Sequence, residues 1–450
     1  MGDIKEVRLE VYNAFKLSGF TIRREASTFV AEQLVSLPPQ KRLELIDKLT
    51  AHLLRQCVSQ PVLEREHLEL AYKECLSTGL EETETILNII DTFSLPKYSY
   101  DSERNKFVKH VTTNNLYPEP KWKAQFLIDR YTIIWQRTIR NELFAREILP
   151  SVNSEKRFQL RKIEVLLSSS SRIDEVIVLG LLTQLTEGKF YIEDPTGSVL
   201  LDISQTRYNS GLFTESSFVL AEGYFEDKIL HVMGFVLPPS ESRITSQPYF
   251  GNGNTFGGSS KNSLKNSQNL LRIEHENQDG MLVFLSDVWL DDLKVMEKLK
   301  SLFSGFNDYP PIKLGDSVAF TTNPCRVQYC TQELILFRQD LVTKLCRNSI
   351  HFPETGDIPD HLIKTLLSQC TLSPLSLGIQ PVYWKHTDAL SLYPMPDLVV
   401  VGDHFQPYTR SYQGCQVINP GSFPRTEFSF KVYIPATRTV EDSQIPKEDT

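Results

Sequence analysis

Asp287 stands where a metal-dependent enzyme could place its first ligand. It follows an apolar run, residues 282–285, that predicts a short buried strand after a polar stretch of chain. A carboxylate at the end of such a strand, with a histidine two residues later, is a common start of a two-metal phosphoesterase site. Here that second position is Trp289, whose indole cannot bind a metal ion. The pattern indicates either a damaged site or a chain that no longer performs this chemistry.

The further ligands that a two-metal site needs are incomplete. Gly315 and Asp316 are the candidates for a bridging carboxylate motif, but no clear apolar strand leads into them. The chain contains no Asn-His dipeptide, and His404 lies one place away from where a His-x-His pair is expected. Asp287 and His404 alone cannot hold two ions. We therefore predict no metal site, with Asp287, Trp289 and His404 as vestigial positions.

Ordinary structural roles are the alternative for these residues. A carboxylate just before a helix accepts hydrogen bonds from free backbone amides and suits the helix dipole, so Asp287 is predicted to cap a helix that begins near Trp289. His404 is expected in a loop or interface, and Ser422 in a turn with no general base beside it. P-loop, nucleophile-elbow and HExxH motifs are missing, and the glycine-rich residues 250–258 do not join a strand to a helix. We predict no catalytic residue and no cofactor.

Composition narrows the classes of function. The 450 residues are enough for about two to four domains with a sizeable core. The formal net charge of -8 argues against nucleic-acid binding by bulk electrostatics, and no apolar run approaches the length of a membrane span. The seven cysteines are scattered without a C-x-x-C pair, which predicts free thiols in a reducing compartment rather than a zinc site.

Hydrophobic periodicity predicts the elements of the first third of the chain. Residues 1–95 predict a helical bundle, because apolar residues recur at helical spacing without strand alternation. Residues 96–170 form a connecting basic and helical segment, in which 14 basic residues against 8 acidic ones give a net charge of +6. An acidic partner, a phosphate backbone and plain solvent are the alternatives for its basic face.

Residues 171–239 change to short strands of alternating pattern, separated by turn signals such as Pro195-Thr196-Gly197. About five strands in this length suit a small closed barrel of the OB type. Such barrels bind single strands through basic grooves and aromatic residues. Here 4 basic residues stand against 10 acidic ones, a net charge of -6 that would repel a phosphate backbone. A protein-interaction or scaffolding role is favoured.

The remaining chain divides into a polar segment and a mixed domain. Residues 240–271 are rich in Ser, Gly and Asn and predict a flexible linker or a long surface loop. Residues 272–450 combine strand-like runs, such as 333–338 and 397–402, with helix candidates, which indicates an α/β sheet domain. The fold class is therefore multidomain α+β, with an N-terminal helical bundle, an OB-fold β-barrel and a C-terminal α/β domain.

Six long motifs carry a resemblance to a known family. They are FYIEDPTGSVLLDIS, FVLAEGYFED, LVFLSDVWLDD, FTTNPCRVQYCTQE, PVYWKHTDALSLYPMPDLVVVGD and INPGSFPR. Together with the order of bundle, barrel and sheet domain, they make the chain similar to the B-subunit family of replicative DNA polymerases. The helical N-terminal domain resembles the epsilon branch of that family. The resemblance covers nearly the whole chain.

The resemblance implies a non-catalytic subunit of a polymerase complex in the nucleus, whose last domain is an inactive calcineurin-like phosphoesterase fold. It implies three partners: the catalytic subunit of DNA polymerase epsilon at its C-terminal zinc-bearing region, the small histone-fold subunits of the complex, and the replicative helicase with its GINS assembly. Contact with DNA is expected to be mostly indirect, and no membrane is involved. An active metal-dependent phosphoesterase or exonuclease, and a stand-alone OB-fold protein that binds single-stranded DNA, are the alternatives.

Compared with that family, the domain at 272–450 lacks a central block. The helix candidate at 291–303 runs almost directly into the strand at 325–330, where the family has two more strand units. We therefore expect a block to be missing near residues 308–320, through a spliced isoform or an incomplete gene model. Loss of central strands leaves edges unpaired and apolar faces exposed, so the shortened domain is predicted to fold poorly.

Overall fold

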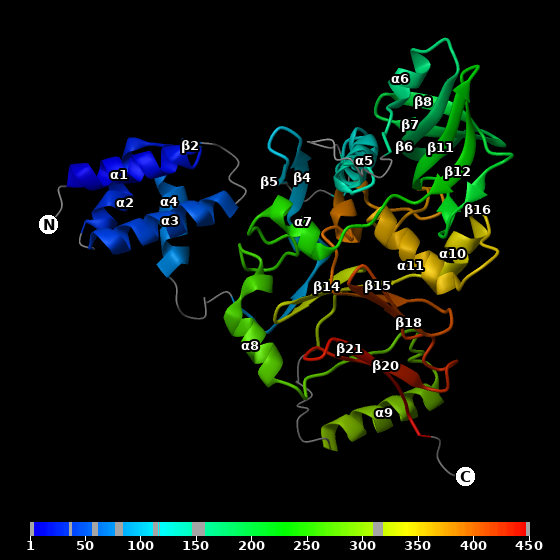
Figure 1. The fold of residues 1–450 in the computed structure, drawn as a ribbon. Coiled ribbons are helices and arrows are strands. Elements are labelled where there is room, and N and C mark those ends of the chain that lie inside the picture. The colour runs from blue at the N-terminus through cyan, green and yellow to red at the C-terminus, as the bar shows by residue number, and fades with distance from the viewer. Residues whose placement is uncertain are drawn as a thin grey trace, which may run out of the picture.

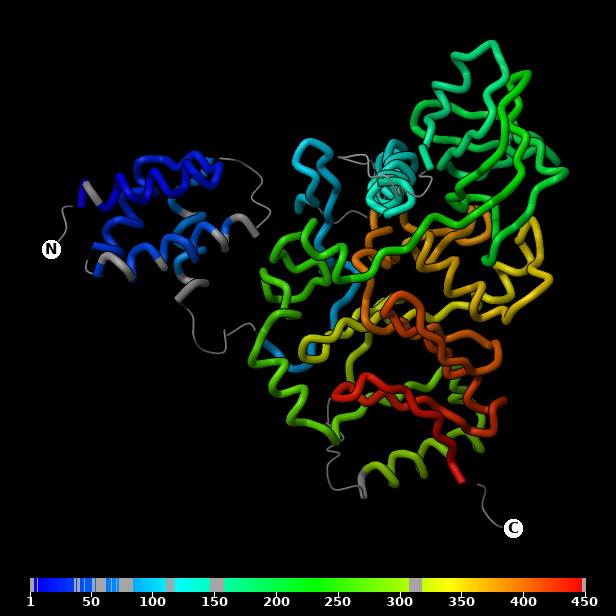
Figure 2. Tube along the Cα trace, in the orientation of Figure 1, coloured from blue at the N-terminus to red at the C-terminus, as the bar shows by residue number. Residues whose placement is uncertain are grey.

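The computed structural model describes residues 4–35, 38–55, 62–76, 84–110, 116, 118–145, 158–308 and 318–446. It is an α+β structure in which a helical unit is followed by a β-barrel and a larger sheet domain (Figure 1). Figure 2 traces the same chain from the first helices, in blue, to the last strands, in red. Within these described residues, no helix is long and apolar enough to cross a membrane.

The N-terminal unit contains four helices and one pair of very short parallel strands. The elements are α1 (Ile4–Leu17), β1 (Thr21–Ile22), α2 (Arg24–Leu34), α3 (Pro39–Arg55), β2 (Val62–Leu63) and α4 (Arg65–Leu76). Apolar residues at helical spacing, such as Val7, Val11 and Phe15 on α1, are fully buried. The described core of this unit is built from residues 7–72 alone.

The segment after α4 differs from the sequence prediction, which continued the bundle to residue 95. β3 (Leu87–Ile90) is a strand that pairs antiparallel with β14 (Cys325–Tyr329) of the last domain. η1 (Thr92–Ser94) and a hairpin of β4 (Lys97–Asp101) and β5 (Lys106–His110) follow it. The helical prediction is wrong at 87–90 because the distant pairing partner decides the conformation of this short apolar run, which contains two isoleucines.

α5 (Trp122–Arg140) is the long helix expected in the connecting segment, and Figure 1 shows it end-on between the hairpin and the barrel. Two basic side chains in its last turn are used inside the protein. Arg137 donates to the carbonyl oxygen of Ser368 at 2.7 Å, and Arg140 pairs with Glu241 at 2.6 Å. These two arginines therefore anchor the helix, so they are not part of a free basic face.

The barrel is closed by the pairing of its first and fifth strands in sheet order. The strands run β11-β6-β7-β8-β12-β9, and β11 also pairs with β12. The elements are α6 (Ile163–Leu167), β6 (Ile173–Thr186), β7 (Lys189–Asp194), β8 (Gly197–Asp202), β9 (Arg207–Tyr208), β11 (Phe218–Glu226) and β12 (Ile229–Val236). Ile163 and Leu166 of α6 join the buried interior. Alternating apolar residues of the strands fill the barrel, as its small size requires.

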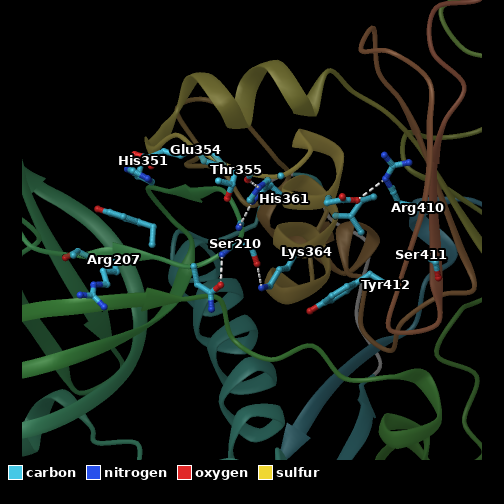
Figure 3. A pocket seen from close by; sticks show the side chains of 18 residues that line it. Arg207, Ser210, His351, Glu354, Thr355, His361, Lys364, Arg410, Ser411 and Tyr412 are labelled. Atoms are coloured by element: carbon cyan, nitrogen blue, oxygen red, sulfur yellow. Dashed lines mark hydrogen bonds and ion pairs between the residues drawn. The ribbon is translucent and has the colours of Figure 1, made fainter.

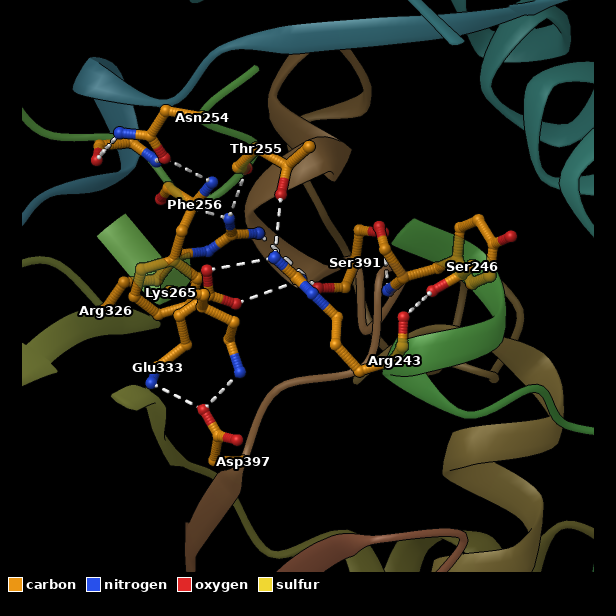
Figure 4. A network of polar contacts seen from close by, with 12 residues as sticks. Arg243, Ser246, Asn254, Thr255, Phe256, Lys265, Arg326, Glu333, Ser391 and Asp397 are labelled. Carbon is orange, nitrogen blue, oxygen red and sulfur yellow. Dashed lines mark hydrogen bonds and ion pairs between the residues drawn. The ribbon is translucent and has the colours of Figure 1, made fainter. Parts of the chain in front are cut away.

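The segment 240–271 is not a flexible linker. It contains α7 (Arg243–Phe250) and η2 (Leu264–Asn266), and it leads into α8 (Gln268–Glu276). Figure 4 shows how buried polar contacts hold it to the sheet domain: Arg243 pairs with Glu333 at 3.0 Å and Lys265 with Asp397 at 2.6 Å. The Ser-, Gly- and Asn-rich composition wrongly predicted a flexible linker. A few buried apolar residues and these ion pairs hold the segment against the last domain, and average hydrophobicity does not reveal them.

The last domain packs two sheets face to face. The larger runs β18-β19-β17-β15-β14-β3, with β15, β17 and β19 parallel, and the smaller runs β13-β20-β21. Its further strands are β13 (Leu282–Phe284), β15 (Gln332–Arg338), β17 (Leu398–Gly402), β18 (Tyr408–Tyr412), β19 (Cys415–Asn419), β20 (Ser429–Ile434) and β21 (Thr439–Gln444). Its helices are α9 (Leu293–Asp308), α10 (Leu341–Arg347), α11 (Ile358–Gln369) and η3 (Trp384–Leu390). A two-residue β10 (Phe213–Thr214) leaves the barrel and pairs with β16 (Ser349–His351) of this domain.

Candidate functional site

The carboxyl ends of β13, β15 and β17 meet at one edge of the last domain. Asp287 follows β13, Asp340 follows β15, and Asp403 and His404 follow β17. Parallel strands such as β15 and β17 bring the residues that follow them to the same sheet edge, where α/β proteins commonly place their sites. The structure therefore brings together Asp287 and His404, two of the predicted vestigial positions.

His404 lies between two carboxylates. Its Nδ1 is 2.5 Å from Asp340 Oδ1 and its Nε2 is 3.2 Å from Asp287 Oδ1. Burial opposes the charged ring, but the charges and hydrogen bonds of Asp340 and Asp287 outweigh it and raise the pKa of His404. The geometry lets each ring nitrogen donate to one of the two acids, and the raised pKa of His404 favours the imidazolium form that does so.

Asp287 is held by protein donors at both of its oxygens. Ser422 Oγ donates to Oδ2 at 2.5 Å, and the Trp289 indole donates to Oδ1 at 3.1 Å. Burial would raise the pKa of Asp287, but these hydrogen bonds and the charge of His404 lower it. The third predicted vestigial position, Trp289, is thus a hydrogen-bond partner of the first.

One structural role expected from the sequence is wrong here. Asp287 does not cap a helix near Trp289, because α9 begins at Leu293 and its first amides donate to Asp292, with Lys294 N at 2.8 Å. Ser422 does lie at a tight turn, but it also donates to the Asp287 carboxylate. The prediction failed because the helix begins later than the sequence pattern suggested.

Asp340 is the residue that sequence reasoning missed. Its signal was an Asp two residues after the strand-like run 333–338, much as Asp287 follows the apolar run 282–285. The neighbouring Asp403 is buried, accepts from the amides of Val342 and Phe405 at 2.9 Å each, and has a pKa raised by burial.

The arrangement at this edge is an ion-pair network rather than an open ligand set. Gly315 and Asp316, the predicted bridging motif, lie outside the described residues. Among the side chains that the structure describes, no group of three or more His, Cys, Asp or Glu is placed to hold a metal ion. The described geometry can fix the loops at the strand ends, and it offers no general base poised against a nucleophile.

A second candidate site is a pocket of about 990 Å³ between β9 of the barrel and α11 and β18 of the last domain (Figure 3). His361 accepts from the Gly211 amide at 2.8 Å and contacts the Thr355 carbonyl at 2.7 Å, which fits a neutral ring with its proton on Nε2. Lys364 donates to Ser210 Oγ. Burial lowers the pKa of Lys364. No described carboxylate pairs with this lysine, so its ammonium can receive an anionic group from a partner.

Comparisons with known proteins agree with the motifs and the fold. Family models match residues 4–75 (DNA polymerases epsilon N terminal), 120–239 (DNA polymerase epsilon subunit 2-like, OB-fold domain) and 312–410 (the B-subunit of DNA polymerases alpha and epsilon). DNA polymerase epsilon subunit 2 of Bos taurus is 41% identical and that of Homo sapiens 40%, each over 98% of this chain and 99% of the relative. The Drosophila melanogaster protein is 38% identical over 99% of both. Each of these alignments runs over 521 positions against 450 residues here, so at least 71 positions have no counterpart in this chain. The resemblance predicted from the sequence is confirmed, and the chain belongs to the DNA polymerase epsilon subunit 2 family.

Proposed function

We propose that this chain is a non-catalytic accessory subunit of the DNA polymerase epsilon complex, acting in the nucleus as a scaffold for the catalytic subunit. The observation that carries the proposal is the rigid attachment of the barrel to the last domain. A scaffold must hold two binding surfaces in fixed relation, and this attachment does so with buried hydrogen bonds.

α11 connects the barrel to the last domain. The Gln369 side chain accepts from the Phe218 amide and donates to the Phe218 carbonyl, both at 2.7 Å, so it pairs with β11 as a neighbouring strand would. One and two turns earlier, Thr365 and His361 accept from the amides of Leu212 and Gly211 at 2.8 Å. Because these groups are buried, separating the domains would leave several polar groups without partners.

We place a segment of the catalytic subunit, from its C-terminal zinc-bearing region, in the pocket beside α11. The pocket spans both domains, and Lys364 and Arg207 line it, together with a Tyr208 ring that stacks on His351 at 4.4 Å. A carboxylate on the partner would stabilise the Lys364 ammonium in its partly buried position. Aromatic and basic residues of this kind are typical anchors of protein interfaces.

Co-purification with the C-terminal region of the catalytic subunit tests the proposal. The full chain is expected to form a stoichiometric complex, and Lys364→Glu is expected to weaken it at least tenfold. Lys189→Glu, an exposed position on the far hairpin of the barrel, is the charge-matched control and is expected to bind normally. A chain with an intact last domain that shows no association would contradict the scaffold role.

The edge that holds Asp287 and His404 belongs, in this proposal, to an inactive phosphoesterase-like domain. Its support is the ion pairing of His404 with both acids and the use of both Asp287 oxygens by protein donors. A phosphodiesterase assay supplemented with manganese is expected to give no activity above background. Activity that disappears on Asp287→Ala would establish a hydrolase instead.

The N-terminal helical unit is proposed to reach the replicative helicase with its GINS assembly, while the small histone-fold subunits join the same complex. The unit completes its core from its own residues, yet Leu9, Leu17 and Leu43 remain exposed, with Leu17 at 90%. Exposed leucines on a self-contained unit suit a protein partner. Leu17→Asp in the full chain is expected to reduce capture of the helicase assembly without affecting capture of the catalytic subunit.

A further inference from the structure

Another cavity, of about 390 Å³, lies where α5, the barrel and the last domain meet. It shares no lining residue with the pocket beside α11. α5 contributes Phe126 and Ile133 to its walls, the barrel contributes Leu181, and the last domain contributes Leu375 and Val382. Its volume and these apolar walls are typical of sites that hold a small organic group.

One cation that lines this cavity, Arg130 of α5, has no acidic partner among the described residues. A guanidinium has five N–H donors. The Arg130 Nη2 donates to the carbonyl oxygen of Ser216 at 2.6 Å, and the guanidinium packs 4.8 Å from the centroid of the Phe218 ring. Its Nε is buried and finds no hydrogen-bond acceptor in the described part of the chain. Burial lowers the pKa of Arg130 to about 10, so an anion within reach would stabilise its charged form.

The two arginines in the last turn of α5 are matched by the protein. Arg137 donates to two carbonyl oxygens and to Cys370 Sγ at the end of α11, where the helix dipole favours a cation. Arg140 pairs with the carboxylate of Glu241. Arg130 has a single hydrogen-bond acceptor among the described residues, the Ser216 carbonyl. It therefore keeps donors for a group that comes from outside the chain.

Acidic side chains elsewhere in the cavity limit the charge that a ligand can carry. These residues are Asp129, Glu193, Glu215 and Asp388. Lys97 lies 3.9 Å from both Asp129 and Asp388, so two of these negative charges are partly offset. A ligand with several negative charges would still be repelled by the acids that remain. The cavity therefore suits one carboxylate at Arg130 better than a phosphate or a polyanion.

We propose that this cavity binds a single carboxylate carried on an apolar group, with the carboxylate against Arg130 and the apolar group against Ile133, Leu375 and Val382. The carboxylate accepts from the Arg130 donors that have no acceptor among the described residues, and a charged pair of this kind makes strong hydrogen bonds. An acidic residue between apolar residues of an extended peptide presents this chemistry, and so does a medium-chain carboxylic acid. The inference rests on the cavity alone and does not depend on the proposed function.

Titration calorimetry of the full chain with two matched pairs of probes tests the proposal. One pair is octanoate and octanamide, and the other is acetyl-Leu-Glu-Leu-amide and acetyl-Leu-Gln-Leu-amide. Within each pair the size is matched and only the acid is charged. We expect at least one acid to bind at least tenfold more tightly than its amide, and the acid that binds more tightly identifies a small molecule or a peptide as the source. Equal binding of acid and amide in both pairs would overturn the proposal, as would no binding of either acid at millimolar concentration.

Substitutions at Arg130 show whether the carboxylate binds there. Arg130→Met removes the donors and should abolish the preference for the acid, whereas Arg130→Lys keeps the charge and should retain part of it. Lys123→Met removes an exposed cation from the same cavity and should change the affinity less than twofold. An undiminished preference for the acid in Arg130→Met would overturn the proposal. If the melting temperature shows that Arg130→Met is unfolded, the comparison of Arg130→Lys with Lys123→Met decides, and equal losses of affinity in these two variants would overturn the proposal.

Discussion

Arg137 offers the sharpest test of how α5 holds the molecule together. Its side chain is 2% exposed and donates to the carbonyl oxygens of Ser368 at 2.7 Å and Leu367 at 3.4 Å. These are among the last carbonyls of α11, where a cation is favoured by the helix dipole. A hydrogen bond to a charged group contributes about 1.5–3 kcal/mol. We therefore expect Arg137→Met, which keeps the length and removes the donors, to cost about 3 kcal/mol at the α5–α11 contact.

Because the chain has several domains, a single unfolding transition would not isolate this contact. Hydrogen exchange of the α5 amides measures its local opening directly. A loss of about 3 kcal/mol predicts roughly hundredfold faster exchange, since about 1.4 kcal/mol is a factor of ten. Lys123→Met, at an exposed position on the same helix, should change it little. Equal exchange in the two variants would refute the assignment of Arg137 as the anchor.

Four further predictions concern His404 and Asp287 at the strand ends, the contact of α11 with the barrel, and the segment 240–271. Because the pKa of His404 is raised in the folded state, its ion pairs stabilise the protein fully below the unfolded pKa of about 6.5, and this stabilisation is lost as pH rises through the folded pKa. The melting temperature should therefore fall slightly on the alkaline side, by a small amount because the ring is half exposed. The melting temperature of His404→Asn should not show this fall. Because the pKa of Asp287 is lowered in the folded state, the protein should lose stability as pH falls below about 4 and this carboxylate takes up a proton. Asp287→Asn should not show this acid loss. Gln369→Met leaves the Phe218 amide and carbonyl unpaired, and should destabilise the domain contact by about 2 kcal/mol, seen as faster exchange of β11. Lys265→Met removes the nearer cation of the partly buried Asp397 and leaves only Arg438, at 3.9 Å, so it should cost about 2 kcal/mol in urea unfolding of the last domain.

Local patterns predicted the elements whose side chains pack within the same segment. The stripe on α1, the long α5 and the alternating strands of the barrel all bury the residues that periodicity selected. Periodicity gave the wrong element where a partner distant in the sequence determines the conformation of a segment. β3 became a strand because β14 pairs with it from more than two hundred residues away, and composition gave no sign that Arg243 and Lys265 would find buried acids in the last domain.

At the candidate site, too, local sequence selected residues, but only the strand order showed which of them meet. Sequence spacing selected Asp287 and His404 but treated them as separate remnants, since their meeting depends on strand order, which the sequence does not state. Asp340 was overlooked for the same reason, although its position after an apolar run was visible. Only the parallel pairing of β15 with β17 places it beside His404.

The identity of the residue at 404 follows from electrostatics once this strand order is fixed. β13 and β15 end in loops that bring the carboxylates of Asp287 and Asp340 to opposite sides of one side chain. Two like charges at a partly buried edge repel, and a cation between them offsets this repulsion. A metal ion is one such cation, and an imidazolium with two N–H donors is another. His404 provides the second solution, because each ring nitrogen can donate to one acid. The charge and hydrogen bond of His404 help to lower the pKa of Asp287, so a neutral residue at 404 should raise that pKa. Titration of the Asp287 carboxyl group by NMR in His404→Asn measures that rise, and an unchanged pKa would show that His404 does not stabilise the Asp287 carboxylate.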